Sequence, residues 1–467
     1  MRIPLLNTGV PGLDRILGGG FPAHSLYLIQ GLAGSGKTTL ACQIGFHHAR
    51  QGKKVMILTL IAETHNKMLN HLSNFSFFDD SLVTERILFL SVYNELLRGG
   101  LRALQKTIAA TLAEHRPDIM IIDGFRTVRE AAPSDMSLSE FMLALNSLVS
   151  TMHCTTFLLS PTEGNVADSE NTLVDGLIAL SQYERGLQLL REIKVFKLRG
   201  SKHMLGRHVF EVDADGIAIY PRLEAINSAA GPEERREFVR LGFGIDGWDL
   251  LTNGGVLAGS TTALLGHPGV GKTLMGLHFI FDGLKRGESC LIAGFHESPL
   301  RLLEKARSVG IDLQPYFDSG KLQVIWHPPL EVLVDSLTQQ VLCNVEQRKV
   351  TRLMVDGIDA LRDIVVHTGR SRAFLVALVN ELRRRHVTTF FMQELPYIAQ
   401  GMGSPDESML FENIILMRYV EIGGVNRRQI SVRKLRENSY DASNHILLIA
   451  DDGMSIEGPA SFHRAPL

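Results

Sequence analysis

The chain of 467 residues is too long for one ordinary hydrophobic core and suits two domains of roughly 200 residues each. Apolar residues make up 45% of it and aromatic residues 7%, as in a globular protein rather than a disordered one. The formal net charge of −2 argues against a protein that coats DNA or an anionic membrane, because such proteins carry a basic field.

The spacing of the cysteines and the length of the apolar runs indicate where in the cell the protein is found. No two cysteines form a CxxC pair, so the sequence predicts neither a zinc site nor a disulfide framework. We expect each to be a small buried side chain in a reducing compartment. Asp14, Arg15 and a glycine run interrupt the first residues before a signal peptide could form, and no apolar run approaches the ~18 residues that span a bilayer. These features predict a cytoplasmic protein without a membrane partner. The four cysteines are Cys42, Cys154, Cys290 and Cys343.

The chain repeats itself. GLAGSGKTT at Gly31–Thr39 recurs as GHPGVGKTL at Gly266–Leu274, and the segments before these loops are also similar. Nearly constant offsets of this kind indicate two copies of one domain. We place the first domain at residues 1–225, a linker of small and charged residues at 226–239, and the second domain at 240–467. Three residue pairs carry the repeat, at separations of 235, 233 and 237 residues: Lys37 with Lys272, Asp123 with Asp356, and Lys197 with Lys434.

In each copy, short apolar runs alternate with stretches of helical periodicity. This alternation predicts an α/β fold with a mostly parallel sheet and helices on both of its faces. In chain order, the first copy predicts strands and one helix at Ser25–Ile29, Val55–Leu60, Leu101–Glu114 (helix), Ile119–Ile122 and Thr156–Leu159. The second copy predicts Thr261–Leu265, Leu291–Ala293, Leu353–Val355, Arg372–Arg385 (helix) and Thr389–Met392.

Both repeated loops fit GxxxxGK[ST], follow an apolar strand and open a helix, which is the context of a phosphate-binding loop. Glycines let backbone N–H groups curl around phosphate oxygens, and the helix N-terminus adds its positive end. We expect each lysine to reach the β- and γ-phosphates of ATP and the threonine after it to bind Mg²⁺. The predicted ATP-binding loop residues are Gly31, Gly34, Ser35, Gly36, Lys37, Thr38 and Thr39, and Gly266, Gly269, Val270, Gly271, Lys272, Thr273 and Leu274.

An apolar strand that ends in aspartate follows each loop, as IMIID at Asp123 and LMVD at Asp356. An aspartate at a strand end can simply cap a helix. Downstream of a phosphate-binding loop, at a matching distance in both copies, it is better explained as the carboxylate that holds Mg²⁺ through water. The predicted metal-binding pairs are Thr38 with Asp123 and Thr273 with Asp356.

Glu63, in LIAETHNKM, and Glu297, in GFHESPLRL, come just after the second predicted strand of each copy. A glutamate there could act as the base that polarises an attacking water. It could equally cap the following helix or interact with its dipole. The residues alone leave both interpretations open.

The two loops, the strand-end aspartates and the segment VFKLRGSKHMLGRHVFEVDADGIAIYP resemble the KaiC family of circadian clock proteins over essentially the whole chain. The resemblance implies two tandem RecA-like P-loop NTPase domains, stacked in a double-ringed homohexamer with ATP between subunits. The segment is similar to the family's KLRGTSH segment, which reaches the nucleotide of a neighbouring subunit. The residues implied to contact ATP in this way are Lys197, Leu198, Arg199, Ser201 and His203, with Lys434 and Arg436 in the second copy. From the residues alone, a K-x-R on a strand suits an arginine finger or a solvated basic edge.

The chain departs from the family pattern in three places. The family has two consecutive glutamates after the second strand, and the first is usually assigned as the base; here that position holds Ala62 and His296. Hydrolysis is therefore expected to be slow, or Glu63 and Glu297 have taken over. The autophosphorylated Ser-Thr pair of the family aligns with Ser408-Met409, which leaves Ser408 as the candidate phosphosite and autokinase activity open. The chain also stops without the family's long tail, and we expect it not to run a clock oscillator.

The leading hypothesis is a slow ATPase whose nucleotide-dependent homohexamer signals its state to an unidentified partner protein. A scaffold that binds ATP but hydrolyses little is the alternative, and the missing first glutamates favour it. A RecA-like DNA motor is a third hypothesis, against which the near-zero net charge and the lack of a Lys/Arg-rich loop count.

Overall fold

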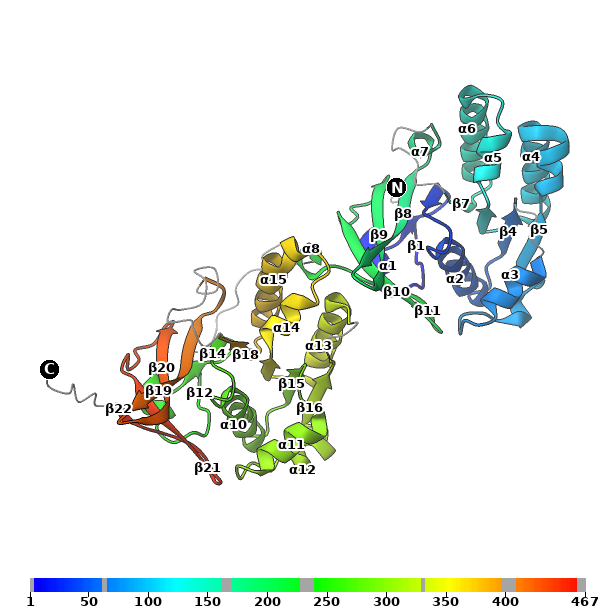
Figure 1. The fold of residues 1–467 in the computed structure, drawn as a ribbon. Helices are drawn as coiled ribbons and strands as arrows, with labels where there is room; N and C mark the ends of the chain where they lie inside the picture. The colour runs from blue at the N-terminus through cyan, green and yellow to red at the C-terminus, as the bar shows by residue number, and fades with distance from the viewer. Residues whose placement is uncertain are drawn as a thin grey trace. The chain divides into compact units, whose positions relative to one another are not determined.

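The computed structural model describes residues 4–60, 65–161, 169–226, 239–328, 332–395 and 409–459. The chain divides into two compact units, Met1–Ile226 and Asn227–Leu467, each with a central sheet and packed helices (Figure 1). The predicted domain boundaries lie close to this division. Most of the predicted linker lies outside the described residues, so the linker stays a prediction.

The first unit is built on a nine-stranded sheet in the order β11-β10-β9-β8-β3-β7-β6-β4-β5. The six strands from β8 to β5 pair in parallel, and β9, β10 and β11 are added antiparallel. The strands are β1 Leu5–Leu6, β2 Phe21–Pro22, β3 Leu26–Gln30, β4 Val55–Thr59, β5 Ile87–Ser91, β6 Ile119–Asp123, β7 Thr155–Ser160, β8 Gly176–Arg185, β9 Gln188–Leu198, β10 Arg207–Asp213 and β11 Gly216–Tyr220. The helices are α1 Leu13–Leu17, α2 Lys37–Arg50, α3 His65–Leu72, η1 Asp80–Leu82, α4 Tyr93–His115, α5 Arg126–Ala131, α6 Asp135–Thr151, α7 Ser169–Leu173 and α8 Leu223–Ile226.

The central strands of this sheet are buried on both faces, which is why they are continuous apolar runs in the sequence. In β3, Tyr27 and Ile29 pack with α2 on one face, whereas Leu26 and Leu28 pack with α4 and α6 on the other. The alternation follows from the two-residue period of a strand. Helices therefore cover both faces, as predicted.

The second unit repeats this plan in the order β16-β15-β17-β18-β14-β19-β20-β21-β22. Its parallel strands run from β16 to β19, and β20 to β22 are antiparallel. The strands are β12 Arg240–Leu241, β13 Val256–Leu257, β14 Thr261–Gly266, β15 Cys290–Gly294, β16 Leu322–Trp326, β17 Arg352–Asp356, β18 Thr388–Glu394, β19 Asn413–Ile422, β20 Val425–Leu435, β21 His445–Ala450 and β22 Gly453–Pro459. The helices are α9 Trp248–Thr252, α10 Lys272–Lys285, α11 Pro299–Arg307, α12 Gln314–Asp318, α13 Val334–Arg348, α14 Ile358–Asp363, η2 Thr368–Arg370 and α15 Ser371–Arg384.

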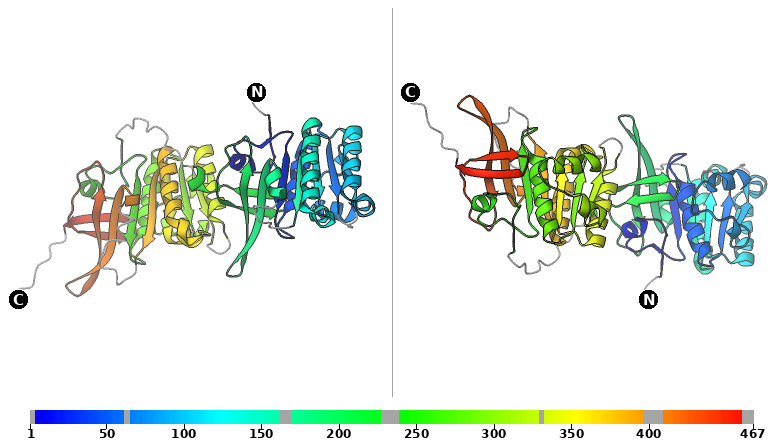
Figure 2. Two further views of the ribbon diagram at one scale, coloured as in Figure 1. Left: turned by 90° about the horizontal axis from the view of Figure 1, so that it is seen from above. Right: turned by 90° about the horizontal axis from the view of Figure 1, so that it is seen from below.

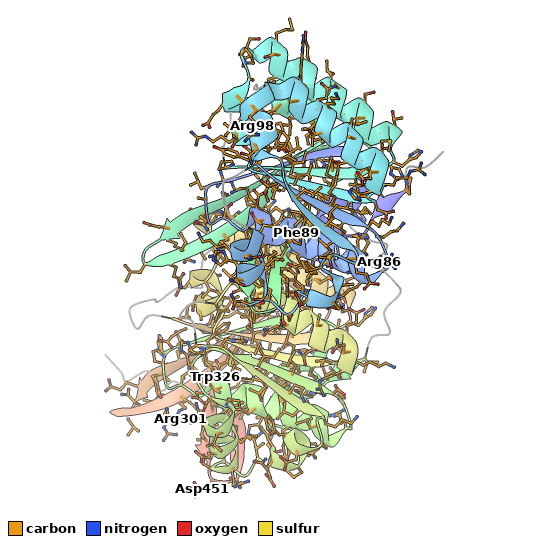
Figure 3. All side chains as sticks on the ribbon, turned by 90° about the vertical axis from the view of Figure 1, so that its right-hand side faces the viewer. Arg86, Phe89, Arg98, Arg301, Trp326 and Asp451 are labelled. Atoms are coloured by element: carbon orange, nitrogen blue, oxygen red, sulfur yellow. The ribbon has the colours of Figure 1, made fainter. Side chains whose placement is uncertain are left out.

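All eight predicted strands are present, with starts within one residue and ends within two of the predicted ones. The predicted α/β fold is confirmed. The edge strands β5 and β16, which carry Phe89 and Trp326 in Figure 3, were not among the predictions. Neither were the antiparallel strands, of which the hairpins β8–β9 and β19–β20 project furthest from their sheets (Figure 2).

The burial of the cysteines and the apolar length of the helices can be compared with what the sequence predicts. Three of the four cysteines are buried, but Cys343 on α13 is exposed, so the expectation of burial was wrong for it. Helical periodicity does not require each position to face the core, and Cys343 lies on the solvent side of its helix. Among the described residues, no helix has the length and apolar character needed to cross a bilayer.

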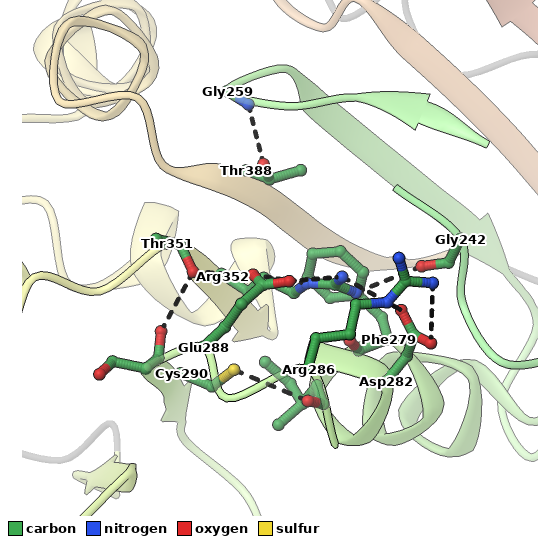
Figure 4. Close-up of polar contacts among 12 residues, drawn as sticks. Gly242, Gly259, Phe279, Asp282, Arg286, Glu288, Cys290, Thr351, Arg352 and Thr388 are labelled. Atoms are coloured by element: carbon green, nitrogen blue, oxygen red, sulfur yellow. Dashed lines mark hydrogen bonds and ion pairs between the residues drawn. The ribbon is translucent and has the colours of Figure 1, made fainter. Parts of the chain in front are cut away.

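A buried arginine ties together the end of the second sheet that lies opposite the phosphate-binding loop (Figure 4). The side chain of Arg352 is completely buried and forms ion pairs with Glu288 at 2.9 Å and with Asp282 at 3.1 Å. It also donates to the carbonyl oxygens of Gly242 at 3.2 Å and Phe279 at 2.8 Å. The guanidinium therefore joins the start of β17 to α10 and to two loops.

Candidate functional site

Both phosphate-binding loops depend on glycine conformations. Gly34 and Gly36 have φ angles of 78° and 96°, and the equivalent Gly269 and Gly271 have 73° and 109°. This left-handed region is accessible to glycine without the steric penalty that a Cβ brings. The sequence pattern thus curls the backbone between β3 and α2, and between β14 and α10, in the same way.

The first glycine of each loop is needed for a different reason. A Cβ on Gly31 would lie 2.1 Å from the carbonyl oxygen of Leu180, and one on Gly266 would lie 2.7 Å from that of Met417. The neighbouring strand, β8 or β19, therefore passes directly beside the loop.

Each loop lysine folds back onto the start of its own loop. The Nζ of Lys37 donates to the carbonyl oxygens of the first two loop residues at 2.7 and 2.8 Å, and Lys272 makes the same two bonds at 2.9 Å each. Burial lowers the pKa of both lysines, and nearby carboxylates oppose this, Asp123 for Lys37 and Glu394 for Lys272. Both ammonium groups are thus in place to contact an anion at the helix N-terminus.

The structure brings the two predicted metal-binding pairs together. The Thr38 hydroxyl donates to Asp123 Oδ2 at 2.9 Å, and the Thr273 hydroxyl donates to Asp356 Oδ2 at 3.2 Å. In the described parts of the chain, no group of three or more His, Cys, Asp and Glu side chains could hold a metal. An oxygen pair of this kind fits Mg²⁺, which keeps several waters and takes phosphate oxygens as its remaining ligands.

Burial raises the pKa of Asp356, the hydrogen bond from Thr273 opposes that change, and the charge of Glu297 adds to it. Glu297 is therefore close enough to the metal-binding pair to influence it. Glu63, its counterpart, lies outside the described residues, and its predicted role stays a prediction.

Glu297 has a partner that the sequence analysis missed. Its Oε1 lies 2.5 Å from the Nζ of Lys305 on α11, whereas its Oε2 is buried and makes no hydrogen bond to any described residue. His296, which replaces the family's first glutamate, packs near Gly357 beside the metal-binding aspartate. The only sequence signal for Lys305 was a lysine eight residues after the glutamate. That spacing is common in helical segments, so it did not single out this lysine.

The second site is more acidic than the first. Asp359 and Glu394, together with Asp356, oppose the effect of burial on the pKa of Lys272, and Asp359 accepts a hydrogen bond from the backbone N–H of Glu394 at 3.3 Å. Arg126 and Pro161 hold the equivalent positions in the first copy. Sequence analysis missed both carboxylates because neither belongs to a motif.

The residues implied to contact ATP from a neighbouring subunit lie far from the loop of their own domain. Lys197 donates to the carbonyl oxygens of Thr172 and Val174, and Lys434 donates to that of Phe411 at 2.7 Å. These contacts are at the amino end of the parallel strands, whereas the loops follow the carboxyl end. The five residues of β3 separate the two ends by ~16 Å.

The remaining residues of this segment differ in what their side chains can reach. Leu198 is buried in the core of the first unit, so its side chain does not face a ligand. Ser201 donates to the carbonyl oxygen of Leu17 at 2.5 Å, and Arg199 pairs with Asp175 at 3.4 Å. The ring nitrogens of His203 make no hydrogen bond to any described residue, and burial lowers its pKa. In the second unit, Arg436 is exposed.

The candidate phosphosite Ser408 lies outside the described residues. Met409, the next residue, is 74% exposed.

The family model for "ATPase: KaiC" matches this chain twice, over residues 6–224 and 241–461. The chain belongs to the KaiC family. It is similar to the circadian clock oscillator protein KaiC of Picosynechococcus sp., at 27% identity over 97% of this chain and 89% of the relative. The KaiC of Parathermosynechococcus lividus is 26% identical, over 97% and 85%, and the circadian clock protein KaiC3 of Synechocystis sp. is 25% identical, over 98% and 92%. The chain thus contains two tandem KaiC-type ATPase domains with a RecA-like fold.

Proposed function

We propose that this KaiC-family protein binds and hydrolyses ATP with Mg²⁺ at two sites, one in each domain. The observation that carries the proposal is the recurrence, in both units, of a loop lysine beside a threonine–aspartate pair at 2.9 and 3.2 Å. Lysine contacts the β- and γ-phosphates, threonine binds the metal directly, and aspartate holds it through water. Thr38 with Asp123, and Thr273 with Asp356, would hold the Mg²⁺, which would supply positive charge to offset the negative charge that develops on the phosphate.

Hydrolysis needs a group that orients or deprotonates the attacking water. We assign this role to Glu63 and Glu297, because the family's first-glutamate position holds Ala62 and His296. In the second domain, Glu297 Oε1 pairs with Lys305, and its buried Oε2, which makes no hydrogen bond to a described residue, is the oxygen that we assign to the water. We expect turnover to be slow because the position usually assigned as the base holds Ala62 and His296, so the neighbouring glutamate has to replace it.

The position of the K-x-R segments supports a homohexamer with nucleotide between subunits. Lys197 and Lys434 are at the end of the sheet opposite their own loops, so a nucleotide that they contact is bound by a different domain, which we propose belongs to a neighbouring subunit. ATP binding then stabilises assembly by mass action. We propose that the assembled ring reports its nucleotide state to a partner protein.

A scaffold that binds ATP without hydrolysing it is the second candidate. The ion pair between Glu297 and Lys305 favours it, because the ammonium group already occupies one oxygen of the carboxylate. Steady-state ADP production per chain separates the candidates. Turnover that Glu63→Gln and Glu297→Gln abolish together supports the ATPase, whereas bound ATP that persists without ADP production supports the scaffold.

A further inference from the structure

One position of the long hairpin donates a hydrogen bond to the phosphate-binding loop in both units. The side-chain amide of Gln182 on β8 donates to the carbonyl oxygen of Gly34 at 2.8 Å. The hydroxyl of Tyr419 on β19 donates to the carbonyl oxygen of Gly269, also at 2.8 Å. Strand pairing shows that the two donors are equivalent when counted from the residue before the first loop glycine. Gln30 pairs with Ala179 and Leu265 pairs with Leu416, and each donor lies three residues beyond that partner. Two different side chains thus make the same contact.

The peptide unit that accepts this bond is held at its other end as well. The N–H of Ser35 donates to the carbonyl oxygen of Leu32 at 3.2 Å, and the N–H of Val270 donates to that of His267 at 3.4 Å. A peptide unit is planar, so fixing both its C=O and its N–H fixes its orientation. This plane lies between the two glycines with positive φ, where the backbone is otherwise most free to rotate.

An arginine of the next strand lies opposite each donor residue. Arg191 of β9 is directly opposite Gln182, and Arg428 of β20 is directly opposite Tyr419. The guanidinium of Arg428 lies 5.7 Å from the centre of the Tyr419 ring, within range of a cation–π contact. These contacts are all within one chain, so they are made without a neighbouring subunit.

We propose that Gln182 and Tyr419 are positioning residues that brace the phosphate-binding loop of their own domain for nucleotide binding. A glycine-rich loop that is free to rotate must be ordered when a nucleotide binds, and this ordering weakens affinity. A hydrogen bond that orders the loop before the nucleotide arrives reduces this entropy cost, and affinity is higher as a result. The inference rests on the proposed function, because it concerns affinity at the proposed ATP sites.

The test measures binding of the non-hydrolysable nucleotide Mg·AMP-PNP to the full chain by equilibrium dialysis. Tyr419→Phe removes only the hydroxyl, and Gln182→Met removes the amide donor at similar length. One hydrogen bond corresponds to about a 2- to 10-fold change in affinity. Each variant should weaken one of the two sites per chain by about that factor and leave the other unchanged, with the thermal unfolding midpoint as in wild type.

The control comes from the other copy of the domain. Tyr419→Gln places the first domain's donor in the second domain and should retain more affinity than Tyr419→Phe. Unchanged affinity in Tyr419→Phe and Gln182→Met, or the same loss in Tyr419→Gln as in Tyr419→Phe, would overturn the brace while leaving the proposed function intact. A wild-type chain that binds no nucleotide would overturn both.

Discussion

Replacing Arg352 by methionine should strongly destabilise the second unit. The guanidinium is completely buried, pairs with two carboxylates at 2.9 and 3.1 Å, and donates to two carbonyl oxygens. Methionine fills a similar volume but leaves Asp282 and Glu288 without their shared cation, and both side chains are at least four-fifths buried. Removing one partner of a buried ion pair reduces the free energy of unfolding by about 3–5 kcal/mol. For a unit of this size, that lowers the unfolding midpoint by about 6–20 °C.

Differential scanning calorimetry of the full chain measures this effect as a shift of one unfolding transition. Arg307→Met is the matched control, because the Arg307 side chain is 66% exposed and its nearest carboxylate oxygen, on Asp312, lies 3.7 Å away. It should change stability by less than about 1 kcal/mol. If Arg352→Met lowers the unfolding midpoint no more than the control does, the contacts of Arg352 do not stabilise this end of the sheet as proposed.

The remaining predictions concern acid stability, assembly and turnover. Burial raises the pKa of Glu288, but its interactions with Arg352, Thr351 and Arg286 together outweigh burial and lower the pKa below 4.5. Wild type should therefore lose this stabilisation as pH falls through the lowered pKa; a gap between wild type and Arg352→Met that stays constant in acid unfolding curves would contradict this. Light scattering should show larger particles with Mg·ATP than without, and unchanged mass would remove ATP as the driver. In the same assay, Lys37→Ala should impair assembly more than Lys272→Ala, since the first copy keeps the fuller KLRGSKH segment; equal effects would argue otherwise. Glu63→Gln should keep ATP bound and remove most ADP production, as losing a general base reduces rates ~10²–10⁴-fold, and a double variant with Glu297→Gln at the wild-type rate would exclude both glutamates.

The parallel core of each domain could be predicted because its strands are buried on both faces. Runs such as Ile119–Asp123 and Leu26–Gln30 are apolar at nearly every position, so they are visible without knowledge of their neighbours. The antiparallel strands could not be predicted in this way. Strand β9, with sequence QLLREIKVFKL, mixes charged and apolar residues because only part of it is covered. The order of the strands depends on tertiary pairing, which no local pattern contains.

In the candidate site, too, residues within a local motif could be predicted, and residues that depend on tertiary contacts could not. Lys37 and Thr38 belong to one contiguous motif. Asp123 could be identified because the equivalent position in the second copy also holds an aspartate, Asp356. Gln182 and Tyr419 could not be found this way, because they contact residues 148 and 150 positions earlier in the chain and differ in type. Aligning the two copies along the hairpin, and asking which positions keep a donor, is the signal that would have found them. The roles of Glu63 and Ser408 stay predictions, since both lie outside the described residues.

The central claim, two ATP sites per chain built by one duplicated motif, is tested most directly by counting bound nucleotides. Equilibrium dialysis with Mg·AMP-PNP at saturating concentration should give two nucleotides per wild-type chain, and fewer for Lys37→Ala, for Lys272→Ala and for the double variant, which should bind none. A wild-type chain that binds one nucleotide, or a double variant that still binds two, would contradict the claim.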